Sequence, residues 1–201
     1  MVVDFGCGGG IDVILAAQLV GSGGKVVGLD FAAQMIERAK TAITKAGLQD
    51  SGIELIVANL GDSQLPSNFS DVVISNCVIN LCPDKDAVYE DAYRILKPGG
   101  HIAISDVILI DDIAPQLRSR FQTTWAGCLG GAILDEDYWQ VVLKAGFVEI
   151  QVISQHTLTP EELTAMASCP GSEFTPSPSS KDLSSVQGKV SSIKFTAYKP
   201  D

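Results

Sequence analysis

Short runs of β-branched and other apolar residues alternate with longer helical stretches along most of the chain. Seven of these runs are typical of strands, and they begin near Met1, Lys25, Ile53, Asp71, His101, Phe147 and Ile193. Between them, apolar residues recur at helical spacing in three segments: Val13 to Val20; Met35, Ile36, Ala39 and Ile43; and Val88, Ala92, Ile95 and Leu96. This alternation predicts an α/β fold in which helices cover both faces of a doubly wound, mostly parallel seven-stranded sheet.

Proline, glycine and serine mark the boundaries of these elements. The third helical segment leads into Lys97-Pro98-Gly99-Gly100, where the proline stops helical hydrogen bonding and the glycines allow a turn into the next strand. Thr159-Pro160-Glu161-Glu162 combines an N-cap, a proline at the first helical position and a capping glutamate, which predicts a short helix. Ser and Pro dominate from Ser168 to Gln187, so we expect a mobile surface loop before a last strand from Ser191 to Tyr198.

Composition and charge exclude several classes of function. The 201 residues, 46% of them hydrophobic, are enough for one domain with a substantial core. A formal net charge of −10 disfavours binding to nucleic acid or to an anionic membrane. No apolar run approaches the length of a membrane span, and the first residues lack the basic start of a secretory signal. We therefore expect a cytoplasmic monomer that acts on a small molecule.

Five cysteines are scattered along the chain without a CxxC pair: Cys7, Cys77, Cys82, Cys128 and Cys169. An odd, unpaired set fits neither a secreted disulfide framework nor a structural zinc site, so we expect reduced thiols. The chain also opens directly on the first central strand, with Val2 and Val3 leading into Asp4. Either a helical segment precedes this strand in the complete protein, or the protein is a shortened member of its family.

A glycine-rich turn follows the first strand and opens a helix, in the segment Asp4-Phe5-Gly6-Cys7-Gly8-Gly9-Gly10. This is the position where open α/β sheets bind nucleotide-like ligands, and Gly6, Gly8 and Gly10 let the backbone approach such a ligand closely. The spacing is GxGxG, and Asp4 precedes it. The pattern suits a ligand with a charged amino acid end better than one with a pyrophosphate.

The second strand ends at Asp30, whose two carboxylate oxygens can accept the hydroxyls of a ribose; the alternative is a helix N-cap. Phe31 and Met35 could flank an adenine, although Met35 suits a core position equally well. After the third strand, Ala58-Asn59-Leu60-Gly61-Asp62 forms a polar turn at the same sheet edge, where a ligand site and a plain surface turn are equally compatible with the residues.

Four segments together resemble the class I methyltransferases in order and spacing: Asp4 to Gly8, Gly28 to Asp30, Asp71 to Ser75, and Leu96 to Gly100. The resemblance implies a Rossmann-like fold with an S-adenosylmethionine pocket. Residues 1–156 would form the core that binds this cofactor, and residues 157–201 a C-terminal extension of the same domain. The implied cofactor-binding residues are Asp4, Gly6, Cys7, Gly8, Gly10, Asp30, Phe31, Met35, Asn59, Leu60 and Asn76.

Two cysteines lie where the methyl acceptor should bind. The fourth strand ends in Ser75-Asn76-Cys77, which places Asn76 and Cys77 at the sheet edge beside the cofactor, although a cysteine there can also be a small hydrophobe. Cys128 lies in a segment of small residues after the fifth strand. The stretches Ser75 to Lys85, Gly127 to Ala132 and Ser191 to Phe195 resemble arsenite methyltransferases.

This second resemblance implies that Cys77 and Cys128 bind As(III), arsenite or methylarsenite, as thiolates, and soft sulfur suits this metalloid. Methyl transfer to bound As(III) depends mainly on proximity and a dry pocket, so we assign no base to His101 or His156. Members of the family carry a further arsenic-binding cysteine upstream of the first strand. An external thiol such as glutathione could complete the arsenic coordination and act as co-reductant.

The other three cysteines have different expected roles, and other functions are also compatible with parts of the sequence. Cys7 and Cys82 are assigned packing roles, whereas Cys169, in the expected surface loop, could be an accessory thiol that handles the metalloid. One rival is a methyltransferase for a carbon or oxygen acceptor such as a quinone or sterol, in which Cys77 and Cys128 only line the pocket. Another is a protein that binds arsenite or S-adenosylmethionine without turnover. A nicotinamide-dependent oxidoreductase is disfavoured by the glycine spacing.

Overall fold

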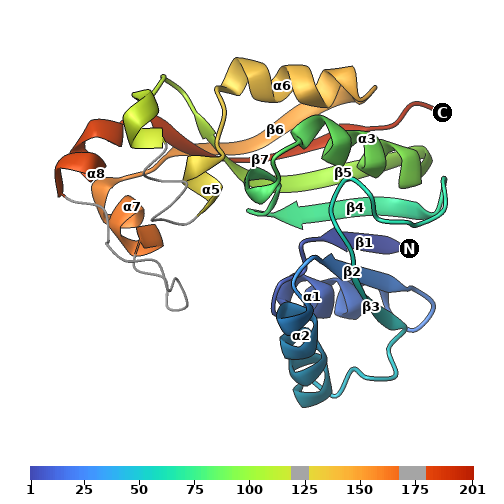
Figure 1. Ribbon diagram of the computed structural model, residues 1–201. Coiled ribbons are helices and arrows are strands. Elements are labelled where there is room, and N and C mark those ends of the chain that lie inside the picture. The colour runs from blue at the N-terminus through green and yellow to red at the C-terminus, as the bar shows by residue number, and fades with distance from the viewer. Residues whose placement is uncertain (119–126, 168–179) are drawn as a thin grey trace.

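The computed structural model describes residues 1–118, 127–167 and 180–201 (Figure 1). Within these ranges, seven strands form one sheet in the order β3-β2-β1-β4-β5-β7-β6. The strands are β1 (Val2–Phe5), β2 (Val26–Asp30), β3 (Ile53–Val57), β4 (Ser70–Asn76), β5 (Leu96–Leu109), β6 (Val148–Thr157) and β7 (Val190–Tyr198). The predicted mostly parallel seven-stranded sheet is confirmed.

The strand order reverses between two central neighbours. From β1 the chain moves outward through β2 to β3 and then returns to β4, which pairs in parallel with the other side of β1. Only β7 runs antiparallel, between β5 and β6. The carboxyl ends of β1 and β4 therefore flank the point at which an open α/β sheet forms its ligand crevice.

Helices follow the strands on both faces of the sheet. They are α1 (Ile11–Val20), α2 (Ala33–Lys45), the 3₁₀ helix η1 (Ile79–Leu81), α3 (Lys85–Ile95), α5 (Gly127–Gly130), α6 (Asp135–Lys144), α7 (Pro160–Ala167) and α8 (Ser180–Val186). The three predicted helical segments correspond to α1, α2 and α3, whereas α6 was not predicted. In the described part of the chain, no helix combines the length and apolar character that crossing a membrane requires.

Strand β2 shows how the two faces are covered. Its Val27 and Leu29 belong to the apolar cluster that includes residues of α3 and α6, whereas Val26 belongs to the cluster beneath α1 and α2. Because successive side chains of a strand point to opposite faces, the two pairs of helices cover opposite sides of the sheet (Figure 1). All three side chains are almost completely buried, as expected for a central parallel strand.

A further apolar cluster lies beyond the carboxyl ends of the parallel strands. Helices α5, α7 and α8 gather at this end of the sheet (Figure 1), and they contribute the fully buried Leu129, Leu163 and Val186. The half-buried Cys77, which directly follows β4, packs against the same cluster. The C-terminal part of the chain thus supplies a wall next to the end of β4.

The prediction of a loop from Ser168 to Gln187 is wrong for its last part, where Ser180–Val186 forms α8. Serine-rich composition hid this helix, because its stability comes from burial of Val186 in an apolar cluster rather than from intrinsic propensity. Residues 168–179 lie outside the described ranges. The predicted helix after Thr159 is confirmed as α7, and its capping box is formed by two reciprocal hydrogen bonds between Thr159 and Glu162.

The fifth strand begins earlier than predicted, at Leu96 instead of near His101. Ser70 pairs with Leu96 and Val72 with His101, so residues 97–100 are extra residues on β5 opposite a short stretch of β4. Gly99 has a φ of +73°, which a glycine adopts without strain. The predicted turn therefore exists, but it interrupts the strand register rather than preceding the strand.

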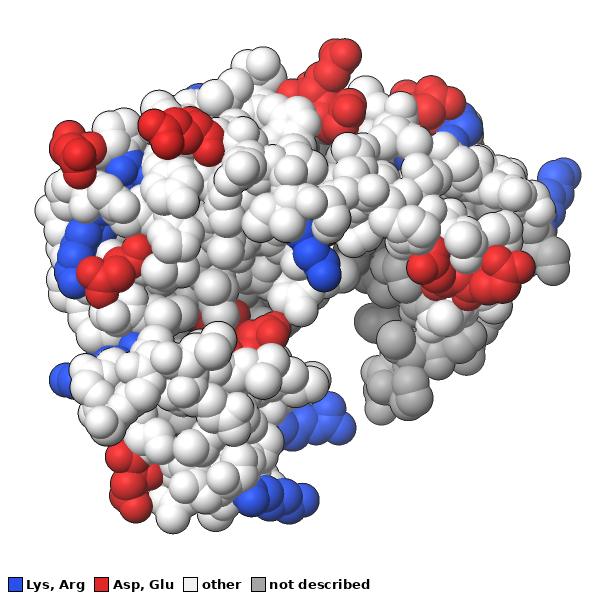
Figure 2. All heavy atoms as spheres, turned by 180° about the vertical axis from the view of Figure 1, so that it is seen from behind, with Lys and Arg blue, Asp and Glu red and all other residues white. Residues whose placement is uncertain are grey.

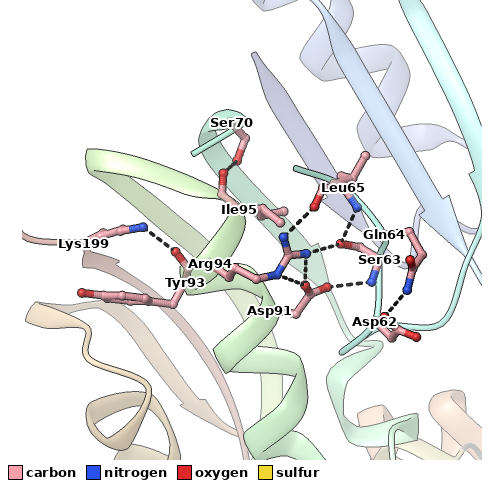
Figure 3. A network of polar contacts seen from close by, with 10 residues as sticks. All are labelled: Asp62, Ser63, Gln64, Leu65, Ser70, Asp91, Tyr93, Arg94, Ile95 and Lys199. Carbon is pink, nitrogen blue, oxygen red and sulfur yellow. Dashed lines mark hydrogen bonds and ion pairs between the residues drawn. The ribbon is translucent and has the colours of Figure 1, made fainter. Parts of the chain in front are cut away.

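A polar network fastens α3 to the segment that leads from β3 to β4 (Figure 3). The buried carboxylate of Asp91 accepts hydrogen bonds from the backbone N–H of Ser63, at 2.9 Å, and from Nε of Arg94, at 3.1 Å. Arg94 also donates from Nη1 to the carbonyl oxygen of Leu65, at 2.6 Å. Because the segment anchored here continues directly from Asn59, the network holds one wall of the candidate ligand site.

We predict that Arg94→Met lowers the free energy of unfolding by about 2 kcal/mol, because it leaves the buried Asp91 carboxylate without its counter-charge. Lys40→Met is the matched control, since Lys40 pairs with Glu37 on the exposed surface and should contribute at most about 0.5 kcal/mol. Urea unfolding of both variants measures the difference. Equal losses in the two variants would contradict the anchoring role of Arg94.

Candidate functional site

The glycine turn after β1 has the conformation that the sequence predicts. Gly6, Gly8 and Gly10 have φ angles of +76°, +49° and +88°. A Cβ on Gly6 would lie 2.4 Å from Cγ2 of Val78, whereas a Cβ on Gly8 would meet nothing within 4 Å. Gly6 is therefore required for close packing against the segment after β4, and Gly8 faces open space in which a ligand has room.

Asp30, at the end of β2, holds this turn in place. Its Oδ2 accepts a hydrogen bond from the N–H of Gly8 at 2.9 Å, and its Oδ1 accepts one from the N–H of Ala32 at 2.8 Å. The N-cap of α2 is Ala32, and no side chain caps this helix end, so the alternative prediction of Asp30 as a helix N-cap is wrong. Each oxygen of Asp30 retains a second lone pair that can accept a ligand hydroxyl, as the predicted ribose contact requires.

Asp4 is the most perturbed acid of the site. Its side chain is almost completely buried, and its Oδ2 has no hydrogen-bond partner among the described residues. Burial, together with the nearby carboxylates of Asp12 and Asp30, raises the pKa of Asp4 to about 8. A buried carboxyl oxygen that lacks a donor is costly in the fold, which is typical of a position that binds a ligand cation or donor.

Two cavities open at this edge of the sheet. One has a volume of about 290 Å³ and is lined by Asp4, Asp12 and Asn76 among others. The other, of about 470 Å³, is lined by Phe31, Asn59, Leu60 and Cys82 among others. Figure 2 shows this side of the molecule hollowed, with acidic side chains inside the hollow. The structure thus brings together five residues that the sequence predicted at a cofactor site: Asp4, Asn76, Phe31, Asn59 and Leu60.

Two predicted cofactor residues are placed differently. Met35 is half-buried on α2, and it lines neither of these two cavities and belongs to none of the three apolar clusters, so its contact with the adenine stays a prediction. Cys7 is buried in the cluster beneath α1 and α2, and burial raises the pKa of its thiol to about 12. A thiol with so high a pKa stays protonated at neutral pH, in agreement with the packing role predicted for Cys7.

Cys77 occupies an unusual backbone position directly after β4. Its φ of +58° lies in the left-handed region, which costs a non-glycine residue energy, and its N–H donates to the carbonyl oxygen of Ser105 at 2.8 Å. The η1 helix that follows Cys77 contacts α5, the short helix that contains Cys128. The side chain of Cys128 and all of Cys169 lie outside the described residues.

Three polar residues near Cys77 were not predicted. Asp12 accepts a hydrogen bond from the amide nitrogen of Asn76 at 3.2 Å, and the buried side chains of Asn80 and Asp106 bond to each other at 3.0 Å. One signal was present in the sequence, because Asn80 and Asp106 are polar residues inside otherwise apolar runs. A buried polar side chain needs a partner, but the sequence does not tell which residue supplies it.

The comparisons with known proteins agree with this geometry. Residues 1–161 match the family model described as a methyltransferase domain. The chain belongs to this methyltransferase domain family. The chain is 36% identical over 151 residues to an arsenite methyltransferase of Halobacterium salinarum, an alignment that covers 75% of this chain and 38% of that protein. It is 34% identical over 165 residues to human arsenite methyltransferase, with 79% and 44% of the two chains covered.

A solved structure shows the same similarity in three dimensions. The chain superposes on the crystal structure of an arsenic(III) S-adenosylmethionine methyltransferase from Chlamydomonas reinhardtii with a TM-score of 0.81 and 29% identity. That superposition covers 99% of this chain and 63% of the other. The alignments span 38% and 44% of the length of the two arsenite methyltransferases from Halobacterium salinarum and human.

We predict that Asp4→Asn stabilises the protein increasingly, relative to the wild type, as the pH rises. The carboxyl of Asp4 has its ordinary pKa near 4 when unfolded and about 8 when folded, so the wild-type protein loses stability between these values because the unfolded state ionises while the buried group keeps its proton. The stability difference between variant and wild type should grow by up to about 1.4 kcal/mol per pH unit and level off above pH 8. Urea unfolding from pH 5 to pH 9 measures it, and a difference that stays constant with pH would contradict the prediction.

Proposed function

We propose that this chain is the catalytic core of an arsenite methyltransferase, which transfers the methyl group of S-adenosylmethionine to As(III) bound by the thiolates of Cys77 and Cys128. The proposal rests on the family to which the chain belongs and on its similarity to proteins described as arsenite methyltransferases. The residues at the carboxyl edge of the sheet provide what each half of such a reaction requires.

The contact between η1 and α5 is the observation that carries the proposal. Cys77 precedes η1 by two residues, and Cys128 is part of α5. Cys77 packs against an apolar cluster whose members include Leu129, the neighbour of Cys128 in the sequence. Two segments that are about fifty residues apart in the sequence, one with Cys77 and the other with Cys128, thus meet beside the end of β4, as a bidentate thiolate site requires.

The cofactor half of the site fits S-adenosylmethionine. The cofactor supplies an electrophilic methyl group on a sulfonium and carries a cationic amino group, and the partnerless, buried Oδ2 of Asp4 is suited to accept a hydrogen bond from that amino group. Asp30 retains lone pairs for the ribose hydroxyls. Phe31, Asn59 and Leu60 line the cavity of about 470 Å³, in which they would surround the adenine.

The chemistry requires little from acids or bases. The lone pair of thiolate-bound As(III) forms the new bond to the methyl carbon, while the electrons of the broken carbon–sulfur bond return to the cofactor sulfur. Arsenic is thereby oxidised by two electrons, and an external thiol such as glutathione reduces it again as the thiol is oxidised to its disulfide. The protein contributes orientation and exclusion of water.

The other described thiols are less suited to bind arsenic. Burial raises the pKa of both Cys7 and Cys82, which favours the protonated thiol over the thiolate that binds a metalloid. The Sγ of Cys82 lies 3.8 Å from the carbonyl oxygen of Val78, within its own turn. Cys82 therefore offers a matched control for Cys77, five residues away in the same segment.

We predict that Cys77→Ser and Cys128→Ser each lower arsenite methylation by at least about a hundredfold, because one thiolate cannot orient As(III) toward the methyl group. Cys82→Ser should retain activity within about threefold. The assay follows transfer of label from methyl-labelled S-adenosylmethionine to arsenic in the presence of arsenite and glutathione.

Binding experiments separate the remaining possibilities. Arsenite should bind the wild-type chain and the Cys82→Ser variant, but only weakly the Cys77→Ser and Cys128→Ser variants. Binding that is unchanged in both of the latter variants contradicts the proposed acceptor site. Tight arsenite binding by a wild-type chain that produces no methylated arsenic, even with glutathione, points to sequestration instead of turnover.

A further inference from the structure

A buried network of polar side chains lies beneath the turn that carries Cys77, and no role in cofactor binding has been assigned to it. Asp106, on β5, accepts hydrogen bonds from Nδ2 of Asn80 at 3.0 Å and from the hydroxyl of Tyr138 at 3.1 Å. The hydroxyl of Tyr89 donates in turn to that of Tyr138 at 2.7 Å. All four side chains are at least 95% buried, so the network has little access to water.

Asn80 enters this network in one orientation only. Its Nδ2 donates both to Oδ1 of Asp106 and to the carbonyl oxygen of Val107, the latter at 2.6 Å. Its Oδ1 has no hydrogen-bond partner among the described residues. A flipped amide would place an oxygen against two acceptor oxygens, so the two bonds from the nitrogen determine how the side chain lies.

The network is fastened to the same strand that holds the backbone of Cys77. The N–H of Cys77 donates to the carbonyl oxygen of Ser105, and Asn80, three residues later, bonds to the next two residues of β5, Asp106 and Val107. Between these points the chain passes through the left-handed conformation of Cys77, with a φ of +58°. A strained conformation of this kind persists only where the surrounding contacts enforce it.

We propose that Asn80 and Asp106 are positioning residues that set the orientation of the Cys77 thiol toward the acceptor site. Asp106 provides the fixed acceptor, and the hydroxyl of Tyr138 holds its second oxygen. Through its hydrogen bond to Asp106, Asn80 fixes the position of η1 and thereby the strained backbone of Cys77. The consequence for arsenic binding rests on the proposed function, whereas the orientation of the thiol itself does not.

Asn80→Leu tests this role, because leucine has a similar size and removes both hydrogen bonds together with the partnerless oxygen. Because leucine leaves Oδ1 of Asp106 and the carbonyl oxygen of Val107 without their hydrogen bonds from Asn80, the melting temperature should fall by several degrees, and the assays are run well below it. We expect the KM for arsenite to rise about tenfold, while the KM for S-adenosylmethionine changes by less than about twofold. The rate at which iodoacetamide alkylates Cys77, followed by peptide mass spectrometry, should change by at least about threefold.

Variants of Asp106 and Tyr89 supply the rescue and the control. Asp106→Asn keeps an acceptor oxygen for Asn80 and should retain most of the wild-type KM for arsenite and alkylation rate, whereas Asp106→Ala should resemble Asn80→Leu. Tyr89→Phe removes a buried hydroxyl of the same network that contacts neither Asn80 nor Asp106, and it should leave both quantities unchanged. If Asn80→Leu does not fold, the comparison of Asp106→Asn with Asp106→Ala tests the positioning role instead.

The outcomes distinguish this inference from the function on which it rests. Wild-type alkylation rates in Asn80→Leu or Asp106→Ala would overturn the positioning role. The same result for Asp106→Asn and Asp106→Ala in every measurement would also overturn it, since a purely structural contribution explains equal losses. A wild-type chain that does not methylate arsenite would contradict the proposed function, and the alkylation rates would still test the orientation of Cys77.

Discussion

The close contact between Gly6 and Val78 is the constraint on which the rest of the site depends. Only the absence of a Cβ on Gly6 allows the side chain of Val78 to pack so close to the glycine turn. Because Val78 directly follows Cys77, this contact sets how near the thiol turn lies to the cofactor turn. It joins the carboxyl ends of β1 and β4 at the point where the strand order reverses, so the two halves of the proposed reaction share one edge of the sheet.

On both sides of this contact, hydrogen bonds hold the backbone in place. Asp30 ties the glycine turn to β2, and Ser105 holds the backbone of Cys77 against β5. The two sides differ in what they leave unsatisfied. On the cofactor side, Oδ2 of the buried Asp4 has no hydrogen-bond partner in the described part of the chain, whereas the thiol side contains a strained backbone at Cys77. Both features cost stability in the fold, and both lie where a ligand would offset the cost.

The sequence predicted the parts of this arrangement that depend on local pattern. Alternating runs of strand and helix residues place Asp4, Asp30 and Cys77 at strand ends, and parallel strands bring such ends to one edge. Pattern could not predict α8, since a serine-rich helix depends on burial of Val186 by distant elements. It also could not show that Met35 lines neither of the two cavities, because core and pocket positions share the same helical spacing.

The polar interactions inside the site depend on pairing between distant segments, which a single sequence does not specify. Asn80 and Asp106 are each visible as polar residues in apolar runs, but their contact results from the position of η1 against β5.

The proposed function depends most on sulfur ligation of arsenic by Cys77 together with Cys128. X-ray absorption at the arsenic edge of the chain loaded with one equivalent of arsenite tests this directly. We expect at least two sulfur ligands on arsenic in the wild-type chain and one fewer in Cys77→Ser. An all-oxygen shell, or a shell that is unchanged in that variant, would contradict the proposed function.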